Sequence, residues 1–284
     1  MELCKPEELR SLLENHGFRF SKSLGQNFLI AGWVPERIAE ASGADRSCGV
    51  VEIGPGVGCL TKELAERAGK VVSIELDKRL LPVLEETVVP MGNVEIVPGD
   101  VMKTDLEALV REKLAGLRPV VCANLPYNIT SPVLTKLLES GMFETVTVMI
   151  QREVTKRICA EPGTADYGAF TVFCRYHAET ELLFDVPPSC FMPQPKVTSA
   201  VVRLTRRERP PVETDEALFF RVVRGAFLQR RKTLVNALQS SFGELDRETL
   251  CAILQRAGLD EKVRGETLDM EAFARVANAI GGLK

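Results

Sequence analysis

Residues 124–127 read NLPY and follow RPVVCA, an apolar run that is typical of a buried strand. The Asn124 side-chain oxygen and the Leu125 carbonyl are two hydrogen-bond acceptors, and Pro126 restricts Leu125 to an extended conformation. Tyr127 adds a ring on which a base can stack. Two acceptors beside a ring suit a flat amine whose nitrogen must react. A turn that ends the strand would also account for Asn and Pro, so residues on the neighbouring strands are needed to distinguish a plain turn from a binding pocket.

Earlier strand ends carry a second set of polar positions. VEIGPGVG places Gly54, Gly56 and Gly58 between a strand and a helix, with a spacing that differs from the G-x-G-x-x-G of pyrophosphate-binding loops. Glu75 ends the next strand and can accept from a ribose diol, and Asp100 ends the third and can accept from an adenine amine. Each acid alone is more often a helix cap or a solvated strand end. Together they indicate a nucleoside without phosphates, such as S-adenosylmethionine.

The elements that must position these residues alternate along the chain. Strands are expected at 49–54, 70–76, 93–100, 119–124 and 145–151, with helices at 59–69, 78–88, 105–116, 131–141 and 152–160. This alternation predicts an α/β fold with a parallel sheet covered on both faces. Three more strand-like runs, at 169–178, 181–186 and 199–205, suggest an antiparallel element that closes the sheet edge.

The pattern changes after RRERPPVE, a charged and Pro-rich segment at 206–213. Helical periodicity then covers 215–228, 231–241, 246–257 and 267–280, with no further strand. We therefore expect a domain boundary near residue 208, with a cofactor-binding domain at 1–208 and a helical domain at 209–284.

Composition limits the class of protein. The net charge is −3, the pI about 5.7 and the mean hydropathy +0.02, which argues against a nucleic-acid partner unless positive charges cluster locally. The eight Cys form no C-x-x-C pair and there are only two His, so we expect no metal site. Unpaired thiols suit a reducing cytosol. No signal peptide and no apolar run of membrane-spanning length is present, so we expect a cytoplasmic protein.

SLGQNFL, VEIGPGVG, IELD, NLPYNI and FMPQPKVTSAVV follow one another in an order that resembles the ribosomal RNA adenine N(6)-dimethyltransferases. The likeness spans residues 22–202 and is greatest to the bacterial enzymes for small-subunit (16S) rRNA. It implies a class I S-adenosylmethionine-dependent methyltransferase fold, Rossmann-like, with a mostly parallel seven-stranded sheet and a small C-terminal all-helical domain that binds RNA. It also implies a set of cofactor-binding residues: Asn27, Leu29, Gly54, Gly56, Glu75, Leu76, Asp100, Val101 and Asn124.

The resemblance implies dimethylation of two adjacent adenosines in the 3′-terminal hairpin of 16S rRNA, in a partly assembled small (30S) subunit, with a role in subunit biogenesis. The expected catalytic residues are Asn124, Leu125, Pro126, Tyr127 and Phe191. We expect Phe191 and Tyr127 to sandwich an unpaired or flipped adenine, although Phe191 could instead be a loop residue packed into the core. We expect no metal in this reaction, because the sulfonium is already activated, and we expect a monomer.

Positive charges gather at several places despite the acidic pI. The expected RNA-binding residues are Lys22, Arg152, Arg230, Arg231 and Lys232, the last three at the start of a helix in the second domain. Each cluster alone is more often a solvated face, whereas several around one site would form a track for phosphates.

Two alternatives remain open at this point. One is a large-subunit (23S) rRNA methyltransferase of the macrolide-resistance type, which shares the NLPY-like and glycine-loop motifs. The other is a non-enzymatic ribosome assembly factor, but such a protein would be expected to lose Glu75, Asp100 or Asn124. A DNA adenine methyltransferase is disfavoured, because its tetrapeptide usually has a second Pro where Leu125 stands.

Overall fold

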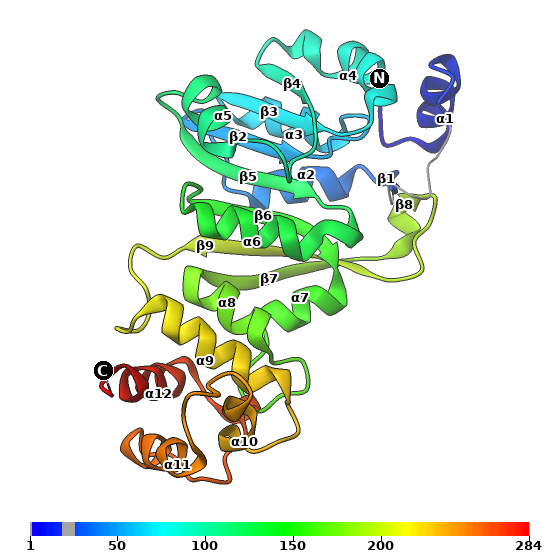
Figure 1. Ribbon diagram of the computed structural model, residues 1–284. Helices are drawn as coiled ribbons and strands as arrows, with labels where there is room; N and C mark the ends of the chain where they lie inside the picture. The colour runs from blue at the N-terminus through cyan, green and yellow to red at the C-terminus, as the bar shows by residue number, and fades with distance from the viewer. Residues whose placement is uncertain (1, 19–25, 284) are drawn as a thin grey trace. The chain divides into compact units, whose positions relative to one another are not determined.

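The main sheet contains the strands predicted around the polar positions. The structure is a computed structural model that describes residues 2–18 and 26–283 (Figure 1). The sheet order is β4 (Val94–Pro98), β3 (Lys70–Glu75), β2 (Cys48–Ile53), β5 (Arg118–Asn124), β6 (Thr145–Gln151), β9 (Ser199–Arg206) and β7 (Ala178–Val186). Neighbours from β4 to β6 are parallel and β9 is antiparallel to β6. The predicted mostly parallel seven-stranded sheet, extended by an antiparallel strand, is confirmed.

Helices cover both faces of this sheet. The helices from the N-terminus to β6 and just after it are α1 (Pro6–Asn15), α2 (Trp33–Ala41), α3 (Cys59–Arg67), α4 (Leu81–Thr87), α5 (Leu106–Lys113), α6 (Thr130–Ser140) and α7 (Arg152–Ile158). One apolar cluster joins Leu64 of α3 and Leu84 of α4 to Val50 and Val71 of the sheet, and α6 lies on the opposite face (Figure 1). Burial on both faces explains the continuous apolar runs of the central strands, because no position there faces water.

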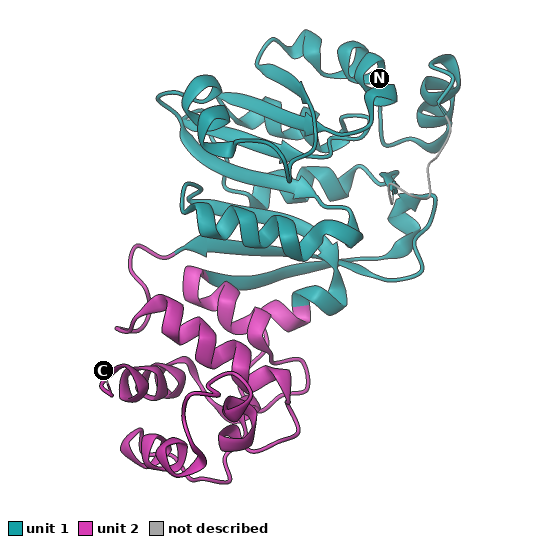
Figure 2. Cartoon of the chain, viewed as in Figure 1, with its two compact units in different colours: residues 1–155, 179–206 teal, residues 156–178, 207–284 magenta. Residues whose placement is uncertain are grey.

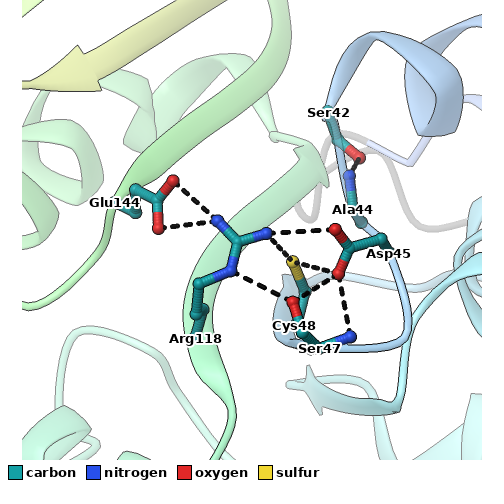
Figure 3. Close-up of polar contacts among 7 residues, drawn as sticks. All are labelled: Ser42, Ala44, Asp45, Ser47, Cys48, Arg118 and Glu144. Carbon is teal, nitrogen blue, oxygen red and sulfur yellow. Dashed lines mark hydrogen bonds and ion pairs between the residues drawn. The ribbon is translucent and has the colours of Figure 1, made fainter.

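The amino-terminal ends of β2 and β5 are joined by a polar network around Arg118 (Figure 3). Its Nη1 donates to both carboxylate oxygens of Glu144 at 2.8 and 2.9 Å, and its Nη2 donates to Asp45 Oδ2 at 3.2 Å. Its Nε donates to Ser47 Oγ at 3.1 Å. Hydrogen bonds from Ser47 lower the pKa of Asp45. This end of the sheet is held by charges that are already paired.

One of the three additional strand-like runs is a helix, so that prediction was wrong. Residues Ala169–His177 form α8, whereas the other two runs form β7 and β9. Aromatic and β-branched residues favour strands, but Phe170, Phe173 and His177 share one helix face, where Phe170 stacks on Phe173 and His177 meets Phe173 edge-on. The Thr171 hydroxyl also accepts from the Gly168 N–H at 3.0 Å and caps the first turn. Capping and tertiary packing therefore override strand propensity.

The chain divides into two compact units, residues 1–155 with 179–206 and residues 156–178 with 207–284 (Figure 2). The division differs from a single boundary near residue 208 because the segment 156–178 packs with the helices that follow residue 207. The Tyr167 hydroxyl, for example, donates to the Leu268 carbonyl at 2.7 Å.

The second unit is helical, as expected from its periodicity. Beside α8 it contains α9 (Glu216–Leu228), α10 (Leu234–Gln239), α11 (Arg247–Arg256) and α12 (Met270–Gly281). Asp215, Asp246 and Asp269 begin α9, α11 and α12, each accepting a hydrogen bond from an N–H in the first turn. No helix within residues 2–18 and 26–283 is long and apolar enough to cross a membrane.

Candidate active site

A cavity in the first unit lies at the carboxyl ends of the parallel strands, where open α/β sheets bind ligands. The structure brings all thirteen predicted cofactor-binding and catalytic residues to its wall: Asn27, Leu29, Gly54, Gly56, Glu75, Leu76, Asp100, Val101, Asn124, Leu125, Pro126, Tyr127 and Phe191. Residues that are far apart in the sequence therefore lie close together at one edge of the sheet.

The glycine loop forms one wall of the cavity. Gly54, Gly56 and Gly58 have positive φ values of 69°, 63° and 94°, which L side chains rarely adopt. A Cβ on Gly56 would lie 3.2 Å from the Phe28 ring, and one on Gly58 would lie 2.5 Å from Val88 Cγ1. The positive φ values at all three positions, and the close contacts at Gly56 and Gly58, therefore favour glycine throughout the turn from β2 into α3.

Glu75 connects this loop to the end of β3. Its side chain is 5% exposed, with one oxygen accepting from the Asp77 N–H at 2.7 Å and the other from the Gly56 N–H at 3.4 Å. Burial raises the pKa of the Glu75 carboxyl above its ordinary value. A hydroxyl donor that reached this carboxylate would compensate part of that desolvation.

Asp77 anchors the N-terminal segment to the same strand end. Its carboxylate accepts from the Gln26 side-chain amide at 2.8 Å and pairs with Arg79 at 2.6 Å. The hydrogen bond from Arg79 lowers the pKa of Asp77. Asn27 follows Gln26 directly, so this contact helps to place Asn27 at the cavity.

Phe191 and Leu29 are joined by a contact that the sequence did not indicate. The two-residue strands β1 (Phe28–Leu29) and β8 (Phe191–Met192) pair antiparallel, with Leu29 opposite Phe191. Phe191 is 3% exposed, packs within the apolar core of the unit and also lines the cavity. Both interpretations of this residue, a wall of the site and a core residue, therefore describe part of its environment.

The NLPY motif begins at the last residue of β5, and all four of its residues line the cavity. The Leu125 N–H donates to the Met149 carbonyl at 3.1 Å, and the Pro126 carbonyl accepts from Ile129 N–H and Thr130 Oγ1, each at 3.2 Å. Among the described residues, neither the Asn124 carboxamide nor the Leu125 carbonyl has an intramolecular hydrogen-bond partner. Partly buried acceptors of this kind are usually satisfied, so these two are available for a ligand.

Tyr127 follows these acceptors in the short 3-10 helix η4 (Tyr127–Ile129). Its hydroxyl forms a hydrogen bond of 2.8 Å with Ser199 Oγ on β9. Burial raises the pKa of Tyr127, so the phenol stays protonated at neutral pH. The hydrogen bond holds one end of the ring against the sheet.

Glu52 is a cavity residue that the sequence analysis missed. It lies inside β2, is 1% exposed, and one of its oxygens accepts from Thr61 Oγ1 at 2.7 Å and Ser73 Oγ at 2.6 Å. Desolvation raises the pKa of Glu52 to about 7. An acid at the fourth position of the apolar run GVVEI was the available signal, because such runs rarely carry a charge.

The charge of the cavity wall tests which ligand fits. Four carboxyl groups line it, those of Glu52, Glu75, Asp77 and Asp100, and the lining residues that the structure describes include no Lys, Arg or His. Phosphate groups need donors or positive charge, whereas a cation gains from nearby carboxylates. The acidic lining, rich in acceptors, therefore fits a cationic nucleoside such as S-adenosylmethionine.

The predicted RNA-binding residues have different surroundings. Arg152 pairs with Asp185 at 3.0 Å. Arg231 and Lys232 are exposed in the turn before α10. We had expected them at the start of a helix, so that placement was wrong. Arg230 Nε pairs with Glu266 at 2.7 Å, and its Nη atoms donate to the carbonyls of Ala165 and Thr164. Arg230 therefore serves the packing of the second unit, and Lys22 lies outside the described residues.

Comparison with known proteins assigns the chain. A model of the ribosomal RNA adenine dimethylase family matches residues 17–280. Ribosomal RNA small subunit methyltransferase A of Geobacillus sp. strain WCH70 is 44% identical over 98% of each chain, and that of Bacillus cereus strain B4264 is 46% identical over 98% of this chain and 97% of its own. The chain belongs to the ribosomal RNA adenine dimethylase family. Its predicted cofactor, S-adenosylmethionine, and its predicted enzyme class, an rRNA adenine dimethyltransferase, are thereby confirmed.

Two solved structures agree with this family assignment. A dimethyladenosine transferase from Plasmodium falciparum superposes with a TM-score of 0.75 and is 26% identical over 88% of this chain and 95% of that one. The 23S rRNA methyltransferase ErmE superposes with a TM-score of 0.69 and is 30% identical over 90% of this chain and 100% of its own. The predicted methyltransferase fold of this dimethylase is confirmed.

Proposed function

We propose that this dimethylase methylates N6 of two adjacent adenosines in the 3′-terminal hairpin of 16S rRNA, within the small (30S) subunit, during subunit biogenesis. The observation that carries the chemistry is the pair of unpartnered acceptors, Asn124 and the Leu125 carbonyl, on a cavity wall without described cations. The choice of the small subunit is supported by relatives of that name at 44% and 46% identity, against 30% for the 23S enzyme.

The cofactor would be held along the strand ends from β2 to β4. Glu75 would accept from the ribose hydroxyls, and Asp100, beside Val101 and Leu76, would accept from the adenine amine. Gly54 and Gly56 let the backbone approach the ligand closely, while Leu29 of β1 and Asn27, which precedes β1, would cover it. When bound, S-adenosylmethionine supplies a methyl group already activated by a positively charged sulfur.

The reacting amine would be aligned by the NLPY motif. The lone pair of N6 is delocalised into the adenine ring, so the amine is a weak nucleophile. If the Asn124 oxygen and the Leu125 carbonyl each accept one N–H, they favour a pyramidal nitrogen whose lone pair is free. The same acceptors stabilise the positive charge that develops on nitrogen during transfer. The surplus proton can leave afterwards, when the nitrogen is acidic, so no strong base is needed.

The ring of the target base would lie between Tyr127 and Phe191. Stacking on an aromatic side chain contributes about 1–3 kcal/mol for each base in single-stranded nucleic acids. The hydrogen bond between Tyr127 and Ser199 orients one ring, and pairing of β8 with β1 orients the other. Two rigid rings would hold the amine in line with the methyl group, where positioning alone contributes several kcal/mol.

Transfer is tested by supplying labelled S-adenosylmethionine and purified small subunits that lack the modification, with large subunits assayed separately. We expect dimethyladenosine at two adjacent positions of the 16S 3′ hairpin and no label in the large subunit. Label in 23S rRNA alone would replace this proposal with the large-subunit alternative, and binding to small subunits without transfer would favour an assembly factor.

RNA binding would use the second unit together with Lys22 and Arg152 of the first. Arg231 and Lys232 are the best candidates there because they are exposed and no ion pair forms with either among the described residues. We expect the double change Arg231→Ala, Lys232→Ala to weaken binding to the small subunit and to reduce the salt dependence by a log–log slope of about 1–2. Titrations at several salt concentrations measure it.

The matched control removes two exposed positive charges from the same unit, Arg256→Ala with Lys262→Ala. An equal loss of salt dependence in the control would attribute the effect to net charge instead of a site. We also propose that the protein is a cytoplasmic monomer. Sedimentation of the free protein would test its oligomeric state.

A further inference from the structure

Lys136 on α6 makes contacts that the proposed mechanism does not use. Its Nζ donates to three backbone carbonyls, those of Val101 at 2.9 Å, Met102 at 3.0 Å and Thr104 at 2.7 Å. An ammonium group has three N–H donors, so these acceptors can use all of them. No carboxylate forms an ion pair with Lys136 in the part of the chain that the structure describes. All three hydrogen bonds of the ammonium group are therefore made to one loop, residues 100–104.

The loop that Lys136 holds carries one end of the cofactor cavity. Asp100 and Val101 line that cavity, and the loop begins where the Gly99 N–H donates to the Glu75 carbonyl at 2.8 Å. Asp100 then accepts from the Met102 N–H through its side chain at 2.9 Å and from Thr104 through its carbonyl. These bonds turn the loop carbonyls of residues 101, 102 and 104 toward α6, where one cation satisfies them.

The helix that carries Lys136 also begins at the catalytic motif. Residue Thr130 starts α6, directly after η4, and its hydroxyl donates to the Pro126 carbonyl at 3.2 Å. A helix is stiff over six residues, so the distance between Lys136 and NLPY is fixed. The Lys136 contacts thus join the loop of Asp100 to the element that places Asn124 and Leu125.

We infer that Lys136 is a positioning residue for cofactor binding: its ammonium fixes the loop 100–104 at the distance from NLPY that S-adenosylmethionine requires. The inference rests on the proposed function of the cavity. Without the cation, no other group among the described residues would donate to the three carbonyls, and the loop would sample arrangements in which Asp100 and Val101 no longer meet the adenine. The predicted consequence is weaker cofactor binding, with little change in the transfer step once the cofactor is bound.

The test compares Lys136→Met with Lys103→Met, a control that removes an exposed positive charge from the same loop. We expect the Kd of S-adenosylhomocysteine, measured by calorimetry, and the KM of S-adenosylmethionine to rise about tenfold in Lys136→Met, corresponding to roughly 1.4 kcal/mol. At saturating cofactor, kcat should stay within about twofold of wild type. The Lys103→Met enzyme should match wild type in all three.

Amide hydrogen exchange separates positioning from a general loss of stability. In Lys136→Met we expect faster exchange confined to residues 99–105, with β2 and β5 unchanged. Lys136→Arg keeps charge and donors but has a planar fork, so it should give an intermediate KM; this variant also carries the test if Lys136→Met fails to fold.

An unchanged Kd and KM in Lys136→Met would overturn the inference, as would a fall in kcat at saturating cofactor with KM unaltered. Calorimetry and exchange need no RNA, so they test Lys136 even if methylation of the small subunit fails. Conversely, wild-type transfer to 16S rRNA with an unaffected Lys136→Met enzyme would reject only the role of Lys136.

Discussion

The two ends of the parallel sheet treat polar groups in opposite ways. At the amino-terminal end, Arg118, Asp45, Ser47 and Glu144 satisfy one another and are open to solvent (Figure 3). At the carboxyl end, the acids Glu52, Glu75 and Asp77 are buried, and the described acceptors of Asn124 and Leu125 have no protein donor. Satisfied, solvated pairs hold elements together, whereas unsatisfied groups in a cavity are available to a ligand. A ligand is therefore expected at the carboxyl end, where the fold leaves two hydrogen-bond acceptors unpaired.

The largest effect should follow removal of an unpartnered acceptor. We expect Asn124→Ala to lower kcat by about 10²–10³-fold, the usual effect of losing one preorganised group that stabilises developing charge. Because the cofactor is proposed to lie along the ends of β2, β3 and β4, S-adenosylhomocysteine should bind within about fivefold of wild type. Single-turnover methylation and calorimetry measure the two quantities. A loss confined to cofactor binding would show that Asn124 acts on the cofactor and not on the amine.

The Tyr127 side chain has a ring that can stack and a hydroxyl that is hydrogen-bonded to Ser199, and two substitutions can separate the contributions of the ring and the hydroxyl. We expect Tyr127→Ala to reduce kcat/KM for the small subunit by about 5–150-fold, from the loss of stacking worth roughly 1–3 kcal/mol. Tyr127→Phe keeps the ring and loses only the hydrogen bond to Ser199, so its kcat/KM should fall no more than about threefold. Equal losses in the two variants would assign the effect to the hydroxyl.

Glu52 should make the stability of the first unit depend on pH. Its pKa in the folded protein is raised to about 7 from an ordinary value of 4.5. The folded state therefore keeps a proton that the unfolded chain releases above pH 4.5, and stability is lost as pH rises through 7. Glu52→Gln keeps the acceptor for Thr61 and Ser73 without a charge. We therefore expect the difference in Tm, Glu52→Gln minus wild type, to be about 2–6 °C larger at pH 8 than at pH 5. This corresponds to roughly 1–2 kcal/mol of unfolding free energy that wild type loses over this range.

Thermal melting of both proteins without cofactor at the two pH values measures this difference. A constant difference in Tm across the range would mean that Glu52 is ionised throughout or that its proton is not linked to folding.

The smallest effect is expected at the amino-terminal end. Arg118→Met removes contacts to Glu144, Asp45 and Ser47, but the pairs are solvent-exposed and screened by salt. We expect a slight fall in Tm at low salt and kcat within about twofold of wild type. Activity lost to the same degree as in Asn124→Ala would remove the distinction between the two ends.

Local patterns were enough to predict the parallel sheet and the strand-end residues of the cavity, whereas Asn27, Leu29, Leu76 and Val101 were expected only from the resemblance to the dimethyltransferases. The runs that became β2, β3, β4, β5 and β6 are each bounded by turns or helices, so their alternation indicated a parallel sheet. Strand ends of such a sheet meet at one edge, which is why Glu75, Asp100 and Asn124 were expected together. Residues 169–178 were misread because their composition favours strands while their aromatic spacing is helical.

The contacts that the sequence did not indicate join segments far apart in the chain. Pairing of Leu29 with Phe191 uses strands of two residues, too short to leave a pattern. Lys136 resembles any lysine on a helix surface until three carbonyls converge on it. Arg230 belonged to a basic run, yet Glu266 and two loop carbonyls engage it.

By itself the sequence determined the alternation of strands and helices from β2 to α7, the glycine positions and which residue types end each of these strands, because these depend on neighbours within a few residues. Only the tertiary structure decided which polar groups are satisfied. A hydrogen bond depends on distance and direction between groups from any part of the chain, and the free acceptors of Asn124 and Leu125 become visible only after every other partner is placed. NLPY could be recognised as a motif from its letters, but its open acceptors are a property of the fold.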